Sequence, residues 1–282
     1  MDERTLGPYF RRDRRSEVTV LEDGTGRSYD AHWLLTSSWK AGNFLRHSGV
    51  REGVTVGVAV GDGLTSPSAL LAFFGTALLG GETWFNPPQD LSAGACRVVV
   101  APADRVETYT LPAGGQRIGY GSQPADQEPS IHHFDSGLWS ENPSFPPLSL
   151  EPEMGLLTDG KRSVTQATAL EAAADVVERA GIDASTRVGV RGPLSDPRTV
   201  IGGVLAPLVA GGTIVLPGSG VGEVDTDADA DADSGADDGC GGNFDGVGDG
   251  ERDEAKDRDI DVSVGPYAQE SSTTIPLESI RW

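Results

Sequence analysis

The chain is organised around the stretch VGVAVGDGLTSPSALLAFFGTALLGG, residues 56–81, which recurs in outline as VGVRGPLSDPRTVIGGVLAPLVAGG, residues 188–212. Each copy begins with a short apolar segment, turns into a longer apolar run and closes on two glycines. Ser66 and Asp196 can accept the free N–H groups at a helix start, and the proline after each suits the first helical position. Each glycine pair then supplies a left-handed helix stop.

A short extended segment follows each glycine pair, at 82–85 and 213–216, so each copy predicts strand, helix and strand. Strands joined by so short a crossover run parallel, which places both copies in one α/β architecture. We expect two related βαβ-containing lobes with helices packed on their sheets. The expected divisions are a first lobe at 1–101, a Pro/Gly-rich connector at 102–150, a second lobe at 151–217, an acidic disordered linker at 218–259 and a C-terminal tail at 260–282.

Other elements follow from local patterns. Alternation over 17–29 around the turn Asp23–Gly26 predicts a hairpin, and Asp30 then caps a helix over 31–48. Further strands are expected at 97–101, 116–120 and 155–158, and a further helix at 164–180, stopped by a glycine. The tail offers a strand at 261–264 and four apolar anchors, namely Ile275, Leu277, Ile280 and Trp282.

The charge of the chain is strongly negative, at −21, and unevenly spread. Between 223 and 261 there are sixteen acidic residues and three basic ones, a composition that opposes compaction. An EF-hand loop beginning at Asp229 would need Gly at its sixth position and Glu at its twelfth, but Ser234 and Cys240 stand there. Scarce lysine beside abundant aspartate resembles the proteins of salt-loving archaea. An acidic mesophilic protein with a charged linker is the alternative.

Several classes of protein are disfavoured. Two cysteines give no disulfide framework, and Cys96 beside an apolar strand is typical of a small core residue. A charged N-terminus argues against a secretory signal, and the longest apolar stretch, 69–79, is too short for a bilayer, so we expect a soluble cytoplasmic protein. The Arg11–Arg15 cluster is interpreted as a solvated face and not as a nucleic-acid site. His132-His133, without further ligands at suitable spacing, indicates surface residues and no metal site.

The order of several strings resembles the N-terminal part of the acyl-adenylate-forming superfamily, the AMP-dependent acyl-CoA synthetases and ligases. The first half carries SYDAHWLL (28–35), LRHSGVREGVTVGVAV (45–60) and GTALLGGETWFNPP (75–88). The second half carries GIDASTRVGVRGPLSD (181–196) and VLAPLVAGGTIVLP (204–217). The resemblance implies the paired subdomains of that fold, with ATP or AMP and CoA as ligands. From the residues themselves no cofactor is assigned.

The phosphate-binding loop of that family is the first departure. Family members carry a Ser/Thr/Gly-rich loop that ends in Pro-Lys-Gly, whose amides and hydroxyls hold the ATP phosphates. The corresponding candidate nucleotide- or phosphate-binding residues here are Thr158, Asp159, Gly160, Lys161 and Ser163. Asp159 replaces a serine and puts a negative charge where phosphate would sit, and Pro-Lys-Gly is missing. The alternative is an ordinary strand-to-helix turn with Ser163 as helix cap.

Two further departures concern catalysis. Asp196 stands where the family has a histidine that lines the acyl pocket. The adenine- and ribose-binding motifs, and the C-terminal domain with its catalytic lysine, should follow residue 217, where this sequence is acidic. We therefore assign no catalytic residue.

Three hypotheses remain open. The first is a truncated, degenerate relative of the ligases that lacks adenylation activity and serves as a regulator or as a partner of a full-length ligase. The second is half of a split ligase, completed by a C-terminal domain on another chain. The third is an unrelated Rossmann-like small-ligand module, suggested by Gly61-Asp62-Gly63 after a strand.

Overall fold

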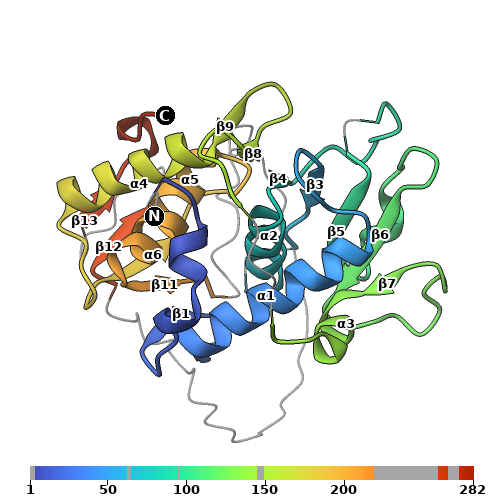
Figure 1. Cartoon of the computed structure of the whole chain (residues 1–282), viewed down its shortest axis with the longest axis horizontal. Coiled ribbons are helices and arrows are strands. Elements are labelled where there is room, and N and C mark those ends of the chain that lie inside the picture. The colour runs from blue at the N-terminus through green and yellow to red at the C-terminus, as the bar shows by residue number, and fades with distance from the viewer. Residues whose placement is uncertain (1–3, 62–64, 95, 145–148, 219–259, 266–272) are drawn as a thin grey trace, which may run out of the picture.

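The computed structural model describes residues 4–61, 65–94, 96–144, 149–218, 260–265 and 273–282. It is a mixed α/β structure of two sheets with helices packed between and over them (Figure 1), which confirms the predicted fold class. The acidic linker expected at 218–259 lies, from residue 219 onward, outside the described residues.

Seven strands form the larger sheet, called here the large sheet, which is parallel apart from the β8–β9 hairpin. In spatial order they are β7 (His132–His133), β6 (Gln116–Tyr120), β5 (Val98–Pro102), β3 (Thr55–Val58), β4 (Glu82–Phe85), β8 (Gly155–Thr158) and β9 (Ser163–Thr165). The strands expected at 97–101, 116–120 and 155–158 are thus present.

Six strands form the small sheet, which is parallel apart from the β1–β2 hairpin. In spatial order they are β13 (Thr273–Ile275), β12 (Val262–Val264), β10 (Arg187–Val190), β11 (Thr213–Val215), β1 (Thr19–Glu22) and β2 (Ser28–Asp30). The C-terminal tail therefore docks, as expected, and buries Ile275, Leu277 and Ile280. Trp282 remains 39% exposed, so its predicted role as an anchor is wrong.

The helices largely follow the predicted caps. They are α1 (Ala31–His47), α2 (Ser68–Leu78), α3 (Phe134–Ser140), α4 (Gln166–Ala180), α5 (Pro197–Val200) and α6 (Ala206–Ala210), with a π-helical segment at Ile201–Leu205. Short 3₁₀ segments are η1 (Gly7–Phe10), η2 (Arg12–Arg14), η3 (Val106–Thr108) and η5 (Leu277–Ser279). Asp30 and Asp196 accept N–H bonds at the starts of α1 and α5, as expected from the sequence. None of the described helices is long and apolar enough to cross a membrane.

The two halves of the chain repeat the same order of elements. Residues 19–85 run hairpin, helix, strand, helix, strand, and residues 155–215 do the same. Corresponding backbone bonds recur, because Glu82 N donates to Val54 O and Thr213 N donates to Thr186 O, both at 2.9 Å. Gly80 and Gly211 both stop their helices with positive φ, at 71° and 78°. The internal duplication inferred from residues 56–81 and 188–212 is therefore present and extends over a longer unit than the sequence indicated.

The two halves also exchange their hairpins. The β1–β2 hairpin of the first half pairs with β11 of the second half, and the β8–β9 hairpin of the second half pairs with β4 of the first half. Each hairpin is joined in sequence to one half and hydrogen-bonded into the sheet of the other. Glu22 of β1 and Arg187 of β10 reinforce one exchange through a two-point ion pair, including an Nη2–Oε2 contact of 2.8 Å. The halves are therefore interlocked and do not form separate bodies.

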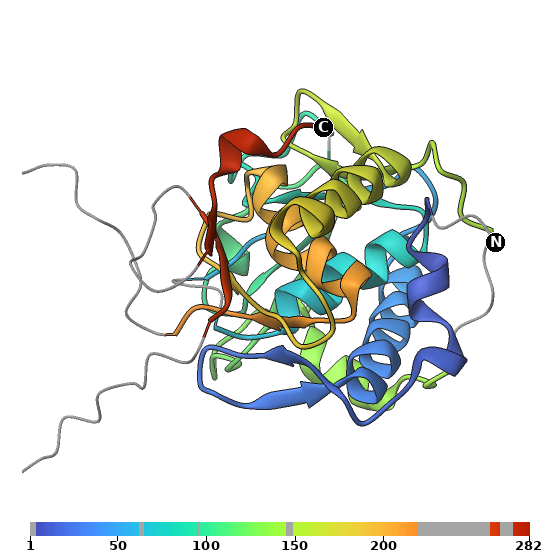
Figure 2. The ribbon, with the colours of Figure 1, turned by 90° about the vertical axis from the view of Figure 1, so that its left-hand side faces the viewer.

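Helix α2 lies at the centre of the molecule (Figures 1 and 2), and all eleven of its residues are buried. A helix that is apolar on every side is typical of a core position. It crosses α1 closely at Gly75, where an added Cβ would lie 2.8 Å from Gly42 N and 2.9 Å from the Ala41 Cβ. Glycine is required there because the two helix backbones almost touch.

We expect Gly75→Leu to lower the free energy of unfolding by about 2 to 3 kcal/mol or more, since the side chain must push α1 and α2 apart. Ala174→Leu, at an exposed position of α4, is the control and should change stability by only about 0.5 kcal/mol. Urea unfolding followed by circular dichroism measures both. Equal effects of the two substitutions would mean that the helix crossing is looser than described.

A second tie lies at the start of α4. The Gln166 side chain is fully buried, and its Oε1 accepts the Leu6 N–H at 2.9 Å. Its Nε2 donates to the Ala77 carbonyl at 3.2 Å. One amide therefore joins the N-terminal segment, the end of α2 and the start of α4, which come from both halves of the chain.

Gln166→Leu fills a similar volume but leaves the Leu6 N–H and the Ala77 carbonyl without this partner. We expect a loss of about 1 to 3 kcal/mol in the free energy of unfolding, because the Leu6 N–H is left buried and unpaired, whereas the Ala77 carbonyl still accepts the Gly80 N–H at 3.0 Å. Gln123→Leu, on an exposed loop, is the matched control. A thermal or urea unfolding series that shows no difference between the two variants contradicts the role of Gln166.

Candidate functional site

The candidate residues 158–163 form the tight turn of the β8–β9 hairpin. Thr158 Oγ1 donates to the Arg162 carbonyl at 2.8 Å and accepts the Gly160 N–H at 3.0 Å. Gly160 has φ +83°, and a Cβ there would collide with the Trp84 indole, so the turn packs directly on β4. The structure thus brings the five predicted residues together in one exposed turn at the end of a strand.

Asp159 binds its own loop. Its Oδ1 accepts the backbone N–H groups of Lys161 and Arg162, at 2.8 and 2.7 Å. These two hydrogen bonds, of which the one from Arg162 has the larger effect, hold the pKa of Asp159 below its ordinary value. The carboxylate is therefore ionised at neutral pH. A carboxylate therefore already occupies the amides that would be offered to a phosphate.

Ser163 does not cap a helix, so that expectation is wrong. It belongs to β9, and its hydroxyl donates to a Glu82 carboxylate oxygen. Thr165 caps α4 instead, with its side chain accepting the Thr168 N–H. Because β9 separates the turn from α4, the candidate residues do not lie at the start of that helix. Burial of Glu82 raises the pKa of that carboxyl.

The adjacent histidines His132 and His133 and the buried Cys96 show no arrangement for metal binding among the described residues. His132 is exposed, and His133 caps α3 and lies 2.8 Å from the Gly121 carbonyl through Nε2. Cys96 is buried in a small apolar cluster with Leu91, Val99 and Val106, as predicted, and burial raises the pKa of its thiol to about 11. Among the described residues, no group of three or more His, Cys, Asp or Glu side chains is placed to hold a metal ion.

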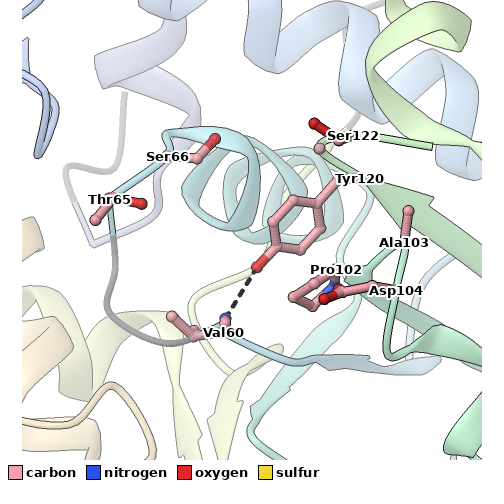
Figure 3. A pocket seen from close by; sticks show the side chains of 10 residues that line it. Val60, Thr65, Ser66, Pro102, Ala103, Asp104, Tyr120 and Ser122 are labelled. Atoms are coloured by element: carbon pink, nitrogen blue, oxygen red, sulfur yellow. Dashed lines mark hydrogen bonds between the residues drawn. The ribbon is translucent and has the colours of Figure 1, made fainter. Parts of the chain in front are cut away.

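A cavity of about 330 Å³ lies at the carboxyl ends of β3, β5 and β6 (Figure 3). The chain leaves β3 for β4 on one side and leaves β5 for β6 on the other, so the cavity lies where the strand order reverses. Ligands of open α/β sheets bind at such points. Its apolar lining comes from Val60, Pro102, Ala103 and Tyr120, and its polar side chains are Thr65, Ser66, Asp104 and Ser122.

Tyr120 fixes the wall of this cavity. Its hydroxyl donates to the Ala59 carbonyl at 2.9 Å and accepts the Gly61 N–H at 3.3 Å, which ties the end of β6 to the end of β3 across β5. The Asp135 carboxylate of α3 joins two parts of the cavity rim, the start of α2 and the end of β6. It accepts hydrogen bonds from the Ser68 hydroxyl at 2.8 Å and from the Gly121 N–H at 2.7 Å. These bonds hold the Tyr120 and Gly121 side of the cavity in place.

The sequence analysis did not identify Asp104, Tyr120 and Ser122 as site residues. They lie just past or at the ends of the strands expected at 97–101 and 116–120. Their place could have been inferred from the rule that the carboxyl ends of parallel strands meet at one edge of the sheet. That rule identifies neighbours only when the order of the strands is known, and the sequence does not give this order.

Tyr120 gives a pH-dependent prediction. Burial, the largest influence, raises its pKa to about 12 from an ordinary value near 10. Below about pH 10 the Tyr120 phenol keeps its proton in the folded and in the unfolded protein, so its contribution to the free energy of unfolding is complete. Between about pH 10 and 12 the phenol is deprotonated in the unfolded protein but still protonated in the folded one, so the free energy of unfolding falls as pH rises.

Tyr120→Phe should lose about 1 to 2 kcal/mol at pH 8, since Gly61 N loses its acceptor, and should show a shallower decline above pH 10. Urea unfolding from about pH 8 to 12 measures both effects. Ala174→Leu, at an exposed position of α4, is the control. An unchanged alkaline slope in Tyr120→Phe would show that the phenol does not titrate as described.

Comparisons with known proteins support the fold assignment. No protein-family model matches the chain, and no curated protein matches its sequence. Solved structures do match. The anthranilate CoA ligase AuaEII, in complex with anthranoyl-AMP, has a TM-score of 0.64 at 17% identity over 75% of this chain and 44% of its own.

Two further matches agree. The acyl-CoA synthetase of Brucella canis has a TM-score of 0.63 at 15% identity over 77% of this chain and 43% of its own. A benzoate CoA ligase from Burkholderia xenovorans LB400 has a TM-score of 0.60 at 20% identity, over 76% of this chain and 45% of its own. This chain therefore has the fold of part of the acyl-CoA ligases and spans less than half the length of those structures. The resemblance read from the sequence is confirmed at the level of fold.

Proposed function

We propose that the chain is an acyl-CoA synthetase-like protein that does not adenylate acids on its own and acts as a regulator or as a partner of a full-length ligase. The shared fold supports the relationship to AMP-dependent ligases. ATP, AMP and CoA are the ligands that this relationship suggests. In this proposal the protein is cytoplasmic, and its net charge of −21 suits it to concentrated salt.

One observation carries the proposal of inactivity. The turn at residues 158–163, which corresponds to the phosphate-binding loop in the resemblance, has its Lys161 and Arg162 amides bound to the Asp159 carboxylate. An ATP phosphate would have to displace that carboxylate and would then meet its negative charge at close range. The cost of that repulsion opposes the charge stabilisation that adenylation needs.

Two other functions have support. The fraction of each ligase that the chain matches, under half, favours half of a split ligase completed by a C-terminal domain on another chain. Co-purification from native cells, followed by an exchange assay of the complex, tests this second candidate. The cavity at the strand-order reversal favours a Rossmann-like small-ligand module.

We expect no ATP–pyrophosphate exchange from the purified chain with fatty, aryl or short-chain acids. Asp159→Ser frees the two amides but should remain inactive, because it adds no group that stabilises the charge at the α-phosphate. Asp159→Ser should nevertheless bind inorganic phosphate more tightly than the wild type, by about fivefold to tenfold, in an isothermal titration.

Asp175→Asn, an exposed carboxylate on α4, is the control for the loss of one negative charge. Exchange activity of the wild-type chain alone would overturn the proposal. Equal phosphate affinity in the wild type and in Asp159→Ser would show that the carboxylate does not block the turn.

A further inference from the structure

The cavity between β3, β5 and β6 has one apolar side and one polar rim. Figure 3 shows the Tyr120 ring between the turn that leads into α2, with Thr65 and Ser66, and the β5 end, with Pro102 and Asp104. Its volume of about 330 Å³ is near the lower end of the range of small-molecule sites. The size therefore suits a compact ring compound of nucleoside size.

The polar groups of the rim are acceptors or can act as acceptors. Asp104 supplies an exposed carboxylate, and Thr65 and Ser122 supply hydroxyls. Ser66 is already engaged, since its Oγ accepts the Ser68 N–H at 3.3 Å. Carboxylates accept hydrogen bonds from ligand hydroxyl or amino groups and repel phosphates. The charge of the rim therefore favours a neutral ligand with several donors.

The equivalent place in the other half of the chain is built differently. Between β10 and β12 of the small sheet, the N–H groups of Arg191 and Gly192 both donate to the Val264 carbonyl, at 2.9 and 3.1 Å. These bonds draw the two strand ends together. At the corresponding ends of β3 and β5, the Ala59 N–H likewise donates to the Val100 carbonyl, at 2.8 Å. The next amide differs, since the Val60 N–H donates to Asn86 Oδ1 at 2.7 Å, and the Tyr120 hydroxyl bonds the Ala59 carbonyl and the Gly61 N–H beside the cavity. The two strand-order reversals of the duplication therefore share one strand-end bond and differ at the next residue, and the cavity lies beside the Tyr120 bridge of the large sheet.

We propose that this cavity binds a neutral, hydroxyl-bearing ring compound of nucleoside size, with the ring against Tyr120 and Pro102 and a ligand hydroxyl bonded to Asp104. The site is separate from the turn at residues 158–163. It does not depend on whether the chain is a relative or a part of an acyl-CoA ligase.

The test is calorimetric titration of the whole chain with adenosine, uridine, 2′-deoxyuridine and uridine monophosphate. For a ligand of this size we expect a Kd on the order of 0.1 mM for at least one nucleoside. Asp104→Asn should weaken that binding about tenfold, because it removes a charged hydrogen-bond acceptor. Ser122→Trp should abolish it by filling the cavity from an exposed position.

Ser140→Trp and Asp175→Asn, both exposed and outside the cavity, are the matched controls and should bind like the wild type. Near-ultraviolet circular dichroism checks that each variant is folded. Three results overturn the proposal: no nucleoside binding up to about 10 mM by folded protein, binding that survives Ser122→Trp, or a monophosphate that binds about tenfold more tightly than its nucleoside. The last result would identify an anion site instead.

Discussion

The rest of the structure depends on the reciprocal exchange of two β-hairpins. Each hairpin is joined by the chain to one half of the molecule and extends the sheet of the other, through β1–β11 and β8–β4 pairing. If a hairpin separated from its sheet, the half of the chain to which that hairpin is joined would be displaced as well. The central helix α2 is then enclosed on all sides, which explains why none of its eleven residues is exposed.

Two of the polar ties between the halves are shielded from solvent, that of Gln166 fully and that of Glu22 with Arg187 in part, so they add to the specificity of the packing. Gln166 bonds the Leu6 N–H and the Ala77 carbonyl, which both lie about ninety residues or more away along the chain. Glu22 of β1 pairs with Arg187 of β10, on the other side of β11. Apolar burial supplies the driving force, whereas these groups fix one arrangement, because a shifted register would leave them unpaired.

The two candidate regions differ in how they use charge. In the turn at residues 158–163 the Asp159 carboxylate is a structural anion that satisfies the loop amides. In the cavity the Asp104 carboxylate lies on an exposed rim beside hydroxyls and an aromatic wall. A chain with the fold of part of the acyl-CoA ligases thus presents a turn whose amides bind their own carboxylate and a cavity at the same carboxyl edge of the large sheet.

The sequence by itself determined the local elements. Helix caps at Asp30 and Asp196, helix-stopping glycines and apolar runs depend on neighbours along the chain, and the duplication is visible as repeated order. It gave the turn at residues 158–163 but assigned Ser163 to a helix cap, because a three-residue strand such as β9 has no period to detect. Only the tertiary structure decided which sheet each hairpin joins, that Asp159 binds its own loop, and that Tyr120 closes a cavity with residues about sixty positions away. Those outcomes are set by pairing and burial between distant segments, which no local pattern encodes.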